Sequence, residues 1–237
     1  MDARAELLAL CERGLDWFPG PDAPTTRIPG LAMPDPSELR PAAVLVLFGV
    51  LDRVPASPAD AAATVVPRDL DVLLLRRAAT LGTHAGQIAF PGGRLEASDG
   101  GAVDAALREA REETGVETGG VEPLGELPPL PVPLSRHLVT PVPAWWTHES
   151  RVAAVDHDES VDVFRVPVAE LLAPANRAMT VLRRDGFVHR APAFTVGERL
   201  VWGVTALILS RMFDELGWAE PWDTGREVVP PARELSR

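Results

Sequence analysis

Residues 87–116 join a short apolar run, a Pro-Gly-Gly turn and a charged amphipathic segment, and this order constrains the fold more than any other part of the chain. The run QIAFPGG, residues 87–93, is typical of a strand that ends in a tight turn. Pro91 fixes its own φ, and Gly92 and Gly93 accept backbone conformations that are closed to other residues. The segment after the turn is expected to be a helix packed on a sheet.

The helix is expected from about Ala102 to Thr114, with Gly115 as its C-cap. Apolar residues recur there at intervals of three and four positions, which is the spacing of one helix face. The stripe expected to pack on the sheet consists of Val103, Ala106, Leu107, Ala110 and Thr114.

Glu109, Glu112 and Glu113 fall together on a neighbouring flank of the same helix. Like charges at i and i+4 cost roughly 0.2–0.5 kcal/mol, and carboxylates near a helix C-terminus also oppose the macrodipole. Arg108 can pair with Glu112 at i+4 and offset part of this repulsion. A solvated acidic face would explain the three glutamates alone. A divalent cation such as Mg²⁺ or Mn²⁺ also fits, because these ions prefer hard carboxylate oxygens and bind substrate phosphates at the same time.

The charge of the chain excludes some partners. A formal net charge of -11 argues against a nucleic-acid binder, which normally carries a basic face. The sequence has no lysine, so all 23 basic residues are arginines, and a phosphate must be met by arginine, backbone N–H groups or a metal ion. The longest apolar run, residues 42–51, is too short to cross a bilayer, and the first residues lack the features of a signal peptide. We therefore expect a cytoplasmic protein without a membrane partner.

With 237 residues, 46% of them hydrophobic, the chain can bury a sizeable core. Strands interleaved with a few helices predict an α/β fold in which helices cover the faces of a mixed sheet. The expected organisation is an N-terminal helix and Pro-rich segment (1–40), a main domain (41–218) and a C-terminal tail (219–237). Apolar runs predict strands at 42–51, 71–77, 87–93, 121–127, 138–146, 161–166, 179–184 and 187–195, and a last helix at 199–216.

The helix REAREETGV resembles the second half of the Nudix hydrolase signature, which places Arg-Glu, Glu-Glu and Gly at fixed intervals. The matching residues are Arg108, Glu109, Glu112, Glu113 and Gly115, with Ala110 and Val116 at the apolar positions. The first half departs from the family pattern. The interval from Gly93 to Arg108 is one residue longer, and Gly100 stands where the first glutamate is expected, while Glu96 and Asp99 are the acids present.

The longer interval is typical of the coenzyme A pyrophosphatase branch of the Nudix family. The upstream signature of this branch resembles LLLRRAATLGTHAGQIAFPGG, residues 73–93, and residues 201–209 resemble one of its C-terminal elements. Two positions depart, since the branch usually has an arginine at the position of Gly82 and commonly a threonine at that of Leu75. The matching residues are Arg77, His84, Gly86, Gln87, Phe90, Pro91, Gly92 and Gly93.

The resemblance implies an α/β/α Nudix sandwich that hydrolyses the diphosphate linkage of coenzyme A or its derivatives to 4′-phosphopantetheine and adenosine 3′,5′-bisphosphate. It implies Mg²⁺ or Mn²⁺ held by Glu109 and Glu113, with Glu112 as a further ligand or as the base for the attacking water. Arg108 would orient a glutamate. Glu159 would be a further catalytic acid from a loop outside the signature, although a solvated turn explains it as well. The implied substrate-binding residues are Arg77, His84, Gln87, Gly92 and Gly93.

Two other functions stay open at this point. Gly82 favours a Nudix pyrophosphatase for ADP-ribose, NADH or another nucleoside diphosphate derivative. A catalytically idle Nudix fold could instead act as a ligand-binding module, although the retained acidic flank of the helix speaks against this. The expected partner is a small-molecule nucleotide in each case, and apolar surface of the N-terminal segment could support a homodimer.

Overall fold

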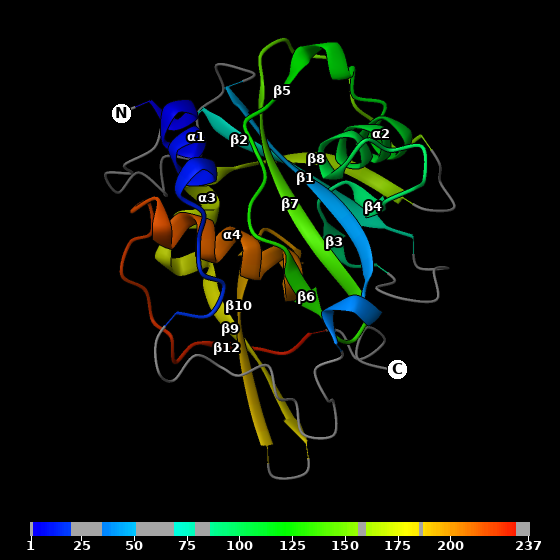
Figure 1. Cartoon of the computed structure of the whole chain (residues 1–237). Helices are drawn as coiled ribbons and strands as arrows, with labels where there is room; N and C mark the ends of the chain where they lie inside the picture. The colour runs from blue at the N-terminus through cyan, green and yellow to red at the C-terminus, as the bar shows by residue number, and fades with distance from the viewer. Residues whose placement is uncertain are drawn as a thin grey trace.

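The computed structural model describes residues 2–19, 35–50, 69–78, 86–155, 160–184 and 187–230, and the structural statements below concern these ranges. Its main feature is an eight-stranded sheet in which β2, β1, β7 and β5 are successive neighbours (Figure 1). β1 (Arg40–Val50) and β7 (His137–Trp146) are parallel, whereas β2 (Leu70–Arg77) pairs with β1 in the antiparallel direction. The predicted mixed sheet is therefore confirmed.

The remaining strands of this sheet extend it or pair beside it, and a second sheet has the order β11-β10-β9-β12. The other strands of the main sheet are β3 (Ile88–Ala89), β4 (Gly92–Arg94), β5 (Val121–Pro123), β6 (Leu130–Val132) and β8 (Ser160–Pro167). The second sheet consists of β9 (Arg177–Arg184), β10 (Phe187–Val196), β11 (Arg199–Val201) and β12 (Glu227–Val228). The helices are α1 (Ala3–Arg13), α2 (Ala102–Thr114), α3 (Val168–Leu172) and α4 (Gly203–Glu215), with 3-10 turns at Pro36–Glu38, Thr118–Gly120 and Pro174–Asn176.

Alternate residues of β1 belong to two separate cores, because successive side chains of a strand point to opposite faces of the sheet. Ala43, Leu45 and Leu47 pack with the alanines of α2, whereas Val46 and Phe48 join the core that contains α1, α3 and α4. In Figure 1, α2 lies on one side of the sheet and α1 and α4 lie on the other. This three-layer arrangement agrees with the predicted α/β/α sandwich. It also explains the apolar run of β1, which is covered on both faces.

The stripe predicted for α2 is confirmed but incomplete. Val103 and Leu107 are half-buried and pack against the core under the helix, and Ala105 and Glu113, which the stripe did not include, are buried. Alanines fill most of the contact between α2 and the sheet, so the helix can approach the strands closely. The contact face is rotated towards Glu113 as a result, which the apolar periodicity alone did not indicate.

The predicted C-terminal helix begins later than expected. Residues 199–201 form β11, which pairs with the end of β10, and α4 starts at Gly203. Gly197 (φ 56°) and Gly203 (φ 67°) both adopt positive φ, so one closes the β10–β11 turn and the other starts α4 in a new direction. The apolar residues of 199–201 fit either a strand or a helix, which is why periodicity did not separate them.

The N-terminal helix α1 packs against the same core as α4. Leu7 and Leu10 are fully buried, and Trp218, which follows α4, donates a hydrogen bond from its indole nitrogen to Glu6 (2.6 Å). None of the helices in the described part of the chain is long and apolar enough to cross a membrane.

Replacing Leu10 with alanine should destabilise the protein by about 2–5 kcal/mol, because it leaves a cavity in the core shared by α1 and α4. Chemical denaturation followed by circular dichroism would measure the loss. Leu134→Ala is the matched control, since Leu134 is 65% exposed and its truncation should change little. Equal effects of the two substitutions would contradict the docking of α1.

Candidate active site

The Gly-Gly turn brings the backbone of β4 against both β1 and α2. A Cβ at Gly92 would collide with the Ala43 carbonyl and with Val44, and a Cβ at Gly93 would collide with the Glu109 carboxylate. β4 pairs with β1 at this point, so the turn cannot retreat without breaking the sheet. Close approach to the backbone of β1 therefore requires glycine at position 92, whereas a Cβ at position 93 would displace the Glu109 carboxylate. The turn places main-chain atoms beside the glutamates of α2.

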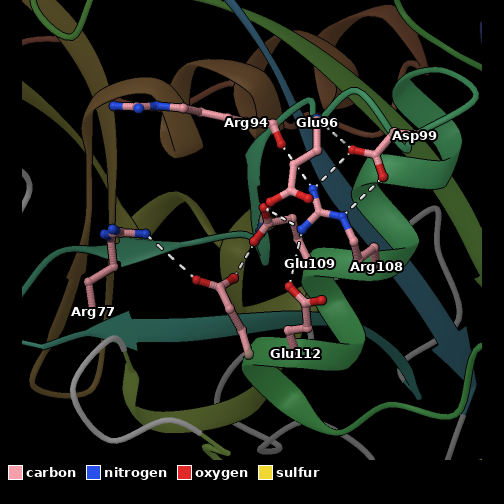
Figure 2. A network of polar contacts seen from close by, with 9 residues as sticks. Arg77, Arg94, Glu96, Asp99, Arg108, Glu109 and Glu112 are labelled. Carbon is pink, nitrogen blue, oxygen red and sulfur yellow. Dashed lines mark hydrogen bonds and ion pairs between the residues drawn. The ribbon is translucent and has the colours of Figure 1, made fainter.

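Glu113 is a buried carboxylate, with only 3% of its side chain exposed. The Gly92 N–H donates a hydrogen bond to Oε2 of Glu113 (2.9 Å), and Nη1 of Arg77 lies 3.7 Å from Oε1 (Figure 2). Burial of a carboxylate without such partners would cost several kcal/mol. The backbone donor and the arginine together offset this cost.

Arg108 forms the centre of the polar network in Figure 2. Its Nε and Nη2 each donate to one oxygen of Asp99 at 3.0 Å, and Nη2 also donates to the Arg94 carbonyl (3.0 Å). Its Nη1 bridges Glu109 (2.9 Å) and Glu112 (3.1 Å), so the predicted pairing of Arg108 with Glu112 is present. The guanidinium is thus held by four side chains or carbonyls and fixes the spacing of the two glutamates.

Asp99 and Arg108 shift the pKa of each other in opposite directions. Hydrogen bonds from Arg108, together with one from the Glu96 N–H, lower the pKa of Asp99 below the ordinary aspartate value. The hydrogen bond to Asp99 is the main cause of the raised pKa of Arg108, although burial opposes it. The pair is a bidentate arginine–carboxylate interaction, the strongest geometry of its type.

The three glutamates offer hard oxygen ligands of the kind that Mg²⁺ and Mn²⁺ take. Glu112 is 51% exposed, while Glu109 and Glu113 lie against the Gly-Gly turn. As the side chains stand in the described ranges, no three acidic, histidine or cysteine groups converge on a common point. The donor set fits a divalent cation in its chemistry and in its closeness to the turn, because all three carboxylates belong to α2 and two of them lie against the turn.

Of the other predicted site residues, some lie in the described ranges and some do not. The Gln87 carbonyl accepts a hydrogen bond from the Arg77 N–H (3.0 Å), which joins two positions of the upstream signature. His84 and Glu159 lie outside the described residues, so their predicted roles stay predictions. Among the described residues, Nε of Arg77 is buried and has no hydrogen-bond partner.

Two residues near the glutamates received no role from the sequence. Asp99 was noted only as an acid beside the irregular spacing, and its bidentate contact with Arg108 shows that it anchors the network. Arg94 follows the Gly-Gly turn directly, and its side chain extends away from the carboxylates in Figure 2. The one available signal was the displaced acid position, because an acid one residue before Gly100 can still reach Arg108.

Comparisons with known proteins point to one family. The sequence model of the NUDIX domain matches residues 58–188. The chain is 36% identical over 149 residues to a protein of Photorhabdus laumondii named uncharacterized Nudix hydrolase NudL, a match that covers 61% of this chain and 76% of the relative. It is 37% identical over 146 residues to the protein of the same name from Cronobacter sakazakii, covering 62% of this chain and 75% of the relative.

Solved structures with a similar arrangement include a MutT/nudix family protein from Enterococcus faecalis, with a TM-score of 0.46, 18% identity, and coverage of 92% of this chain and 75% of that one. Another is the NUDIX domain of Shewanella oneidensis NrtR in complex with ADP ribose, with a TM-score of 0.40, 21% identity, and coverage of 56% of this chain and 76% of that one.

Replacing Asp99 with asparagine should make the protein less stable at neutral pH, and the difference from wild type should disappear in acid. Because the folded pKa of Asp99 is lowered, its charge stabilises the fold above the ordinary pKa of ~3.9, and this contribution is lost as the pH falls through the lower folded value. Denaturant unfolding at a series of pH values from neutral to ~3 would measure it.

Asp104→Asn is the control for this experiment, because Asp104 is an exposed carboxylate in the first turn of α2 and accepts one hydrogen bond from the Gly100 N–H (3.0 Å). A difference between Asp99→Asn and wild type that stays constant with pH would show that the Arg108–Asp99 charge pair does not stabilise the fold.

Proposed function

The chain belongs to the Nudix hydrolase family, and from this premise we propose that it hydrolyses the diphosphate linkage of coenzyme A or one of its derivatives in the presence of Mg²⁺ or Mn²⁺. The products would be 4′-phosphopantetheine and adenosine 3′,5′-bisphosphate.

The observation that carries this proposal is the way residues of the upstream signature meet Glu113. Arg77 and Gly92 both contact the Glu113 carboxylate, and the Arg77 N–H bonds to the Gln87 carbonyl. Arg77, Gln87 and Gly92 of the upstream signature are thus joined with Glu113 of α2 in one polar site. Because the upstream signature resembles that of the coenzyme A branch and also builds the site, the resemblance bears on the substrate as well as on the fold.

Glu109, Glu112 and Glu113 are the residues proposed to hold the divalent cation. Such a cation, when bound, neutralises charge on the substrate phosphates and lowers the pKa of a water molecule that attacks them. Glu112 is the most exposed of the three and is held by one hydrogen bond from Arg108, so it can reach a water molecule as the general base. Arg108 is already occupied by Asp99 and the glutamates, and its proposed role is to orient Glu109 and Glu112.

Arg77 is proposed to bind a phosphate of the substrate. Its Nη1 lies near Glu113, whereas its Nε is buried and lacks a partner within the described ranges. A buried donor without a partner costs about 1–3 kcal/mol, and an incoming phosphate oxygen would remove this cost. An arginine beside a carboxylate also keeps a doubly charged diphosphate from being repelled by the glutamates of α2.

The direct test of the proposed substrate is hydrolysis of coenzyme A, acetyl-coenzyme A, ADP-ribose, NADH and a deoxynucleoside triphosphate by the purified protein, with Mg²⁺ and Mn²⁺ compared. We expect the highest kcat/KM for a coenzyme A species, with 4′-phosphopantetheine or its acyl derivative identified by mass spectrometry. A higher kcat/KM for ADP-ribose or NADH would contradict the substrate and keep the hydrolase. Binding without any hydrolysis would favour the idle ligand-binding module.

Replacing Glu112 or Glu113 with glutamine should lower kcat by about a hundredfold or more, because it removes a proposed base or cation ligand. Glu117→Gln is the matched control, since Glu117 lies in the exposed turn just after α2. Thermal unfolding of each variant would separate a catalytic loss from misfolding, which matters most for the buried Glu113. Full activity of both variants would contradict the assigned roles.

A further inference from the structure

The side chain of Arg94 lies on the face of the sheet opposite to α2. Gly93 faces the Glu109 carboxylate on the α2 side, and successive residues of a strand point in opposite directions. Arg94 is paired with Ala42 of β1, which belongs to the core on the α1 and α4 side. Figure 2 agrees, because the Arg94 side chain runs away from the glutamates while its carbonyl stays bonded to Arg108.

A histidine holds the Arg94 side chain across β1. Nε of Arg94 donates a hydrogen bond to Nε2 of His137 (3.3 Å). His137 belongs to β7 and pairs with Arg40 of β1. β4 and β7 flank β1, so this contact bridges strands about 10 Å apart. Ala42 lies between them, and its small side chain leaves room for the arginine to cross.

The outer edge of this guanidinium is available to a ligand. Nη1 and Nη2 of Arg94 have no hydrogen-bond or ion-pair partner within the described ranges, and the residue is exposed. The Arg94 carbonyl and Nε are both fixed, so the two terminal amino groups are held in one direction. Two parallel donors on a planar fork match the oxygens of a phosphate group.

The charge around Arg94 is positive in a chain whose net charge is -11. Arg40 shares the face of Arg94, and Arg136 precedes His137 at the same end of β7. An acid also lies at this end of the strands, since Glu38 is 3.5 Å from Arg136. A local positive potential next to an acidic site favours a second anionic group of the same ligand.

We propose that Arg94, positioned by His137, binds a phosphomonoester that the substrate carries in addition to the diphosphate that is cleaved. The diphosphate belongs beside the glutamates and Arg77, on the α2 side of Gly93. Arg94 is the next residue and points to the face of the sheet opposite α2. Its ligand would therefore be separated from the cleaved bond by about the length of an arginine side chain. This inference rests on the proposed function, since coenzyme A carries such a group as its 3′-phosphate.

The test compares coenzyme A with dephospho-coenzyme A, which lacks only the 3′-phosphate. Arg94→Gln should lower kcat/KM for coenzyme A by about tenfold or more, mainly through KM, and should change kcat/KM for dephospho-coenzyme A less than about twofold. His137→Ala should give a smaller loss in the same direction, because it leaves the charge and removes its support. Arg226→Gln, which removes an exposed arginine outside the site, is the matched control.

Equal losses of kcat/KM on the two substrates would overturn the inference, because they would show that Arg94 contacts the shared diphosphate or has only a structural role. Equal kcat/KM of the wild type for the two substrates would overturn it as well. If the wild type cleaves neither, the proposed function fails and calorimetric titration decides the inference alone. Tighter binding of adenosine 3′,5′-bisphosphate than of AMP, with the preference lost in Arg94→Gln, would then support it, and no preference would refute it.

Discussion

Burial of the Glu113 carboxylate imposes the main constraint on this site. A carboxylate that is almost fully removed from water requires partners other than solvent. The Gly92 N–H supplies a hydrogen bond, and Arg77 supplies an ion pair. Gly92 lets β4 lie against the backbone of β1, Gly93 leaves room for the Glu109 carboxylate, and in this position the Gly92 N–H reaches Glu113. Burial of Glu113 therefore depends on three elements together, which are the Gly-Gly turn, the alanine-rich face of α2 and the end of β2.

The short strand β4 presents different groups to the two faces of the sheet. On the α2 side, β4 presents Gly93 to the glutamates, and on the other side it presents Arg94 to His137. Arg108 connects the glutamates of α2 to the main chain of β4, because it bonds to Glu109, to Glu112 and to the Arg94 carbonyl. A shift of β4 would thus change the carboxylates and the exposed arginine together. The helices on both faces limit such a shift by packing on β1, the partner of β4.

Local interactions were predictable from the sequence to the extent that they lie within one helix. The limits of α2, the pairing of Arg108 with Glu112 and the αL C-cap at Gly115 follow from spacing alone, and the structure contains all three. The role of Asp99 did not follow, because its contact with Arg108 depends on the path of the loop that joins β4 to α2. The second sheet was also missed. β9 and β10 were predicted at about the right residues, whereas β11 falls within the predicted last helix and β12 within the predicted tail. Pairing partners such as β12 and β9 are distant in sequence and leave no local periodicity.

The absence of lysine from the chain makes the surroundings of each arginine informative about its role. Arg108 is saturated by a bidentate aspartate and two glutamates, which leaves it no capacity for substrate and suits it to hold other side chains in place. Arg77 has one ion-pair partner, because its Nη1 lies near the Glu113 carboxylate, while its Nε has no partner in the described part of the chain. Arg94 is held only through its Nε and its carbonyl, by partners that carry no negative charge. Because an ion pair with a protein carboxylate competes directly with a phosphate, the affinity of these three guanidinium groups for substrate should rise in the order Arg108, Arg77, Arg94. Under the proposed function, Arg108 would support other side chains, Arg77 would contact the diphosphate and Arg94 would contact a second phosphate.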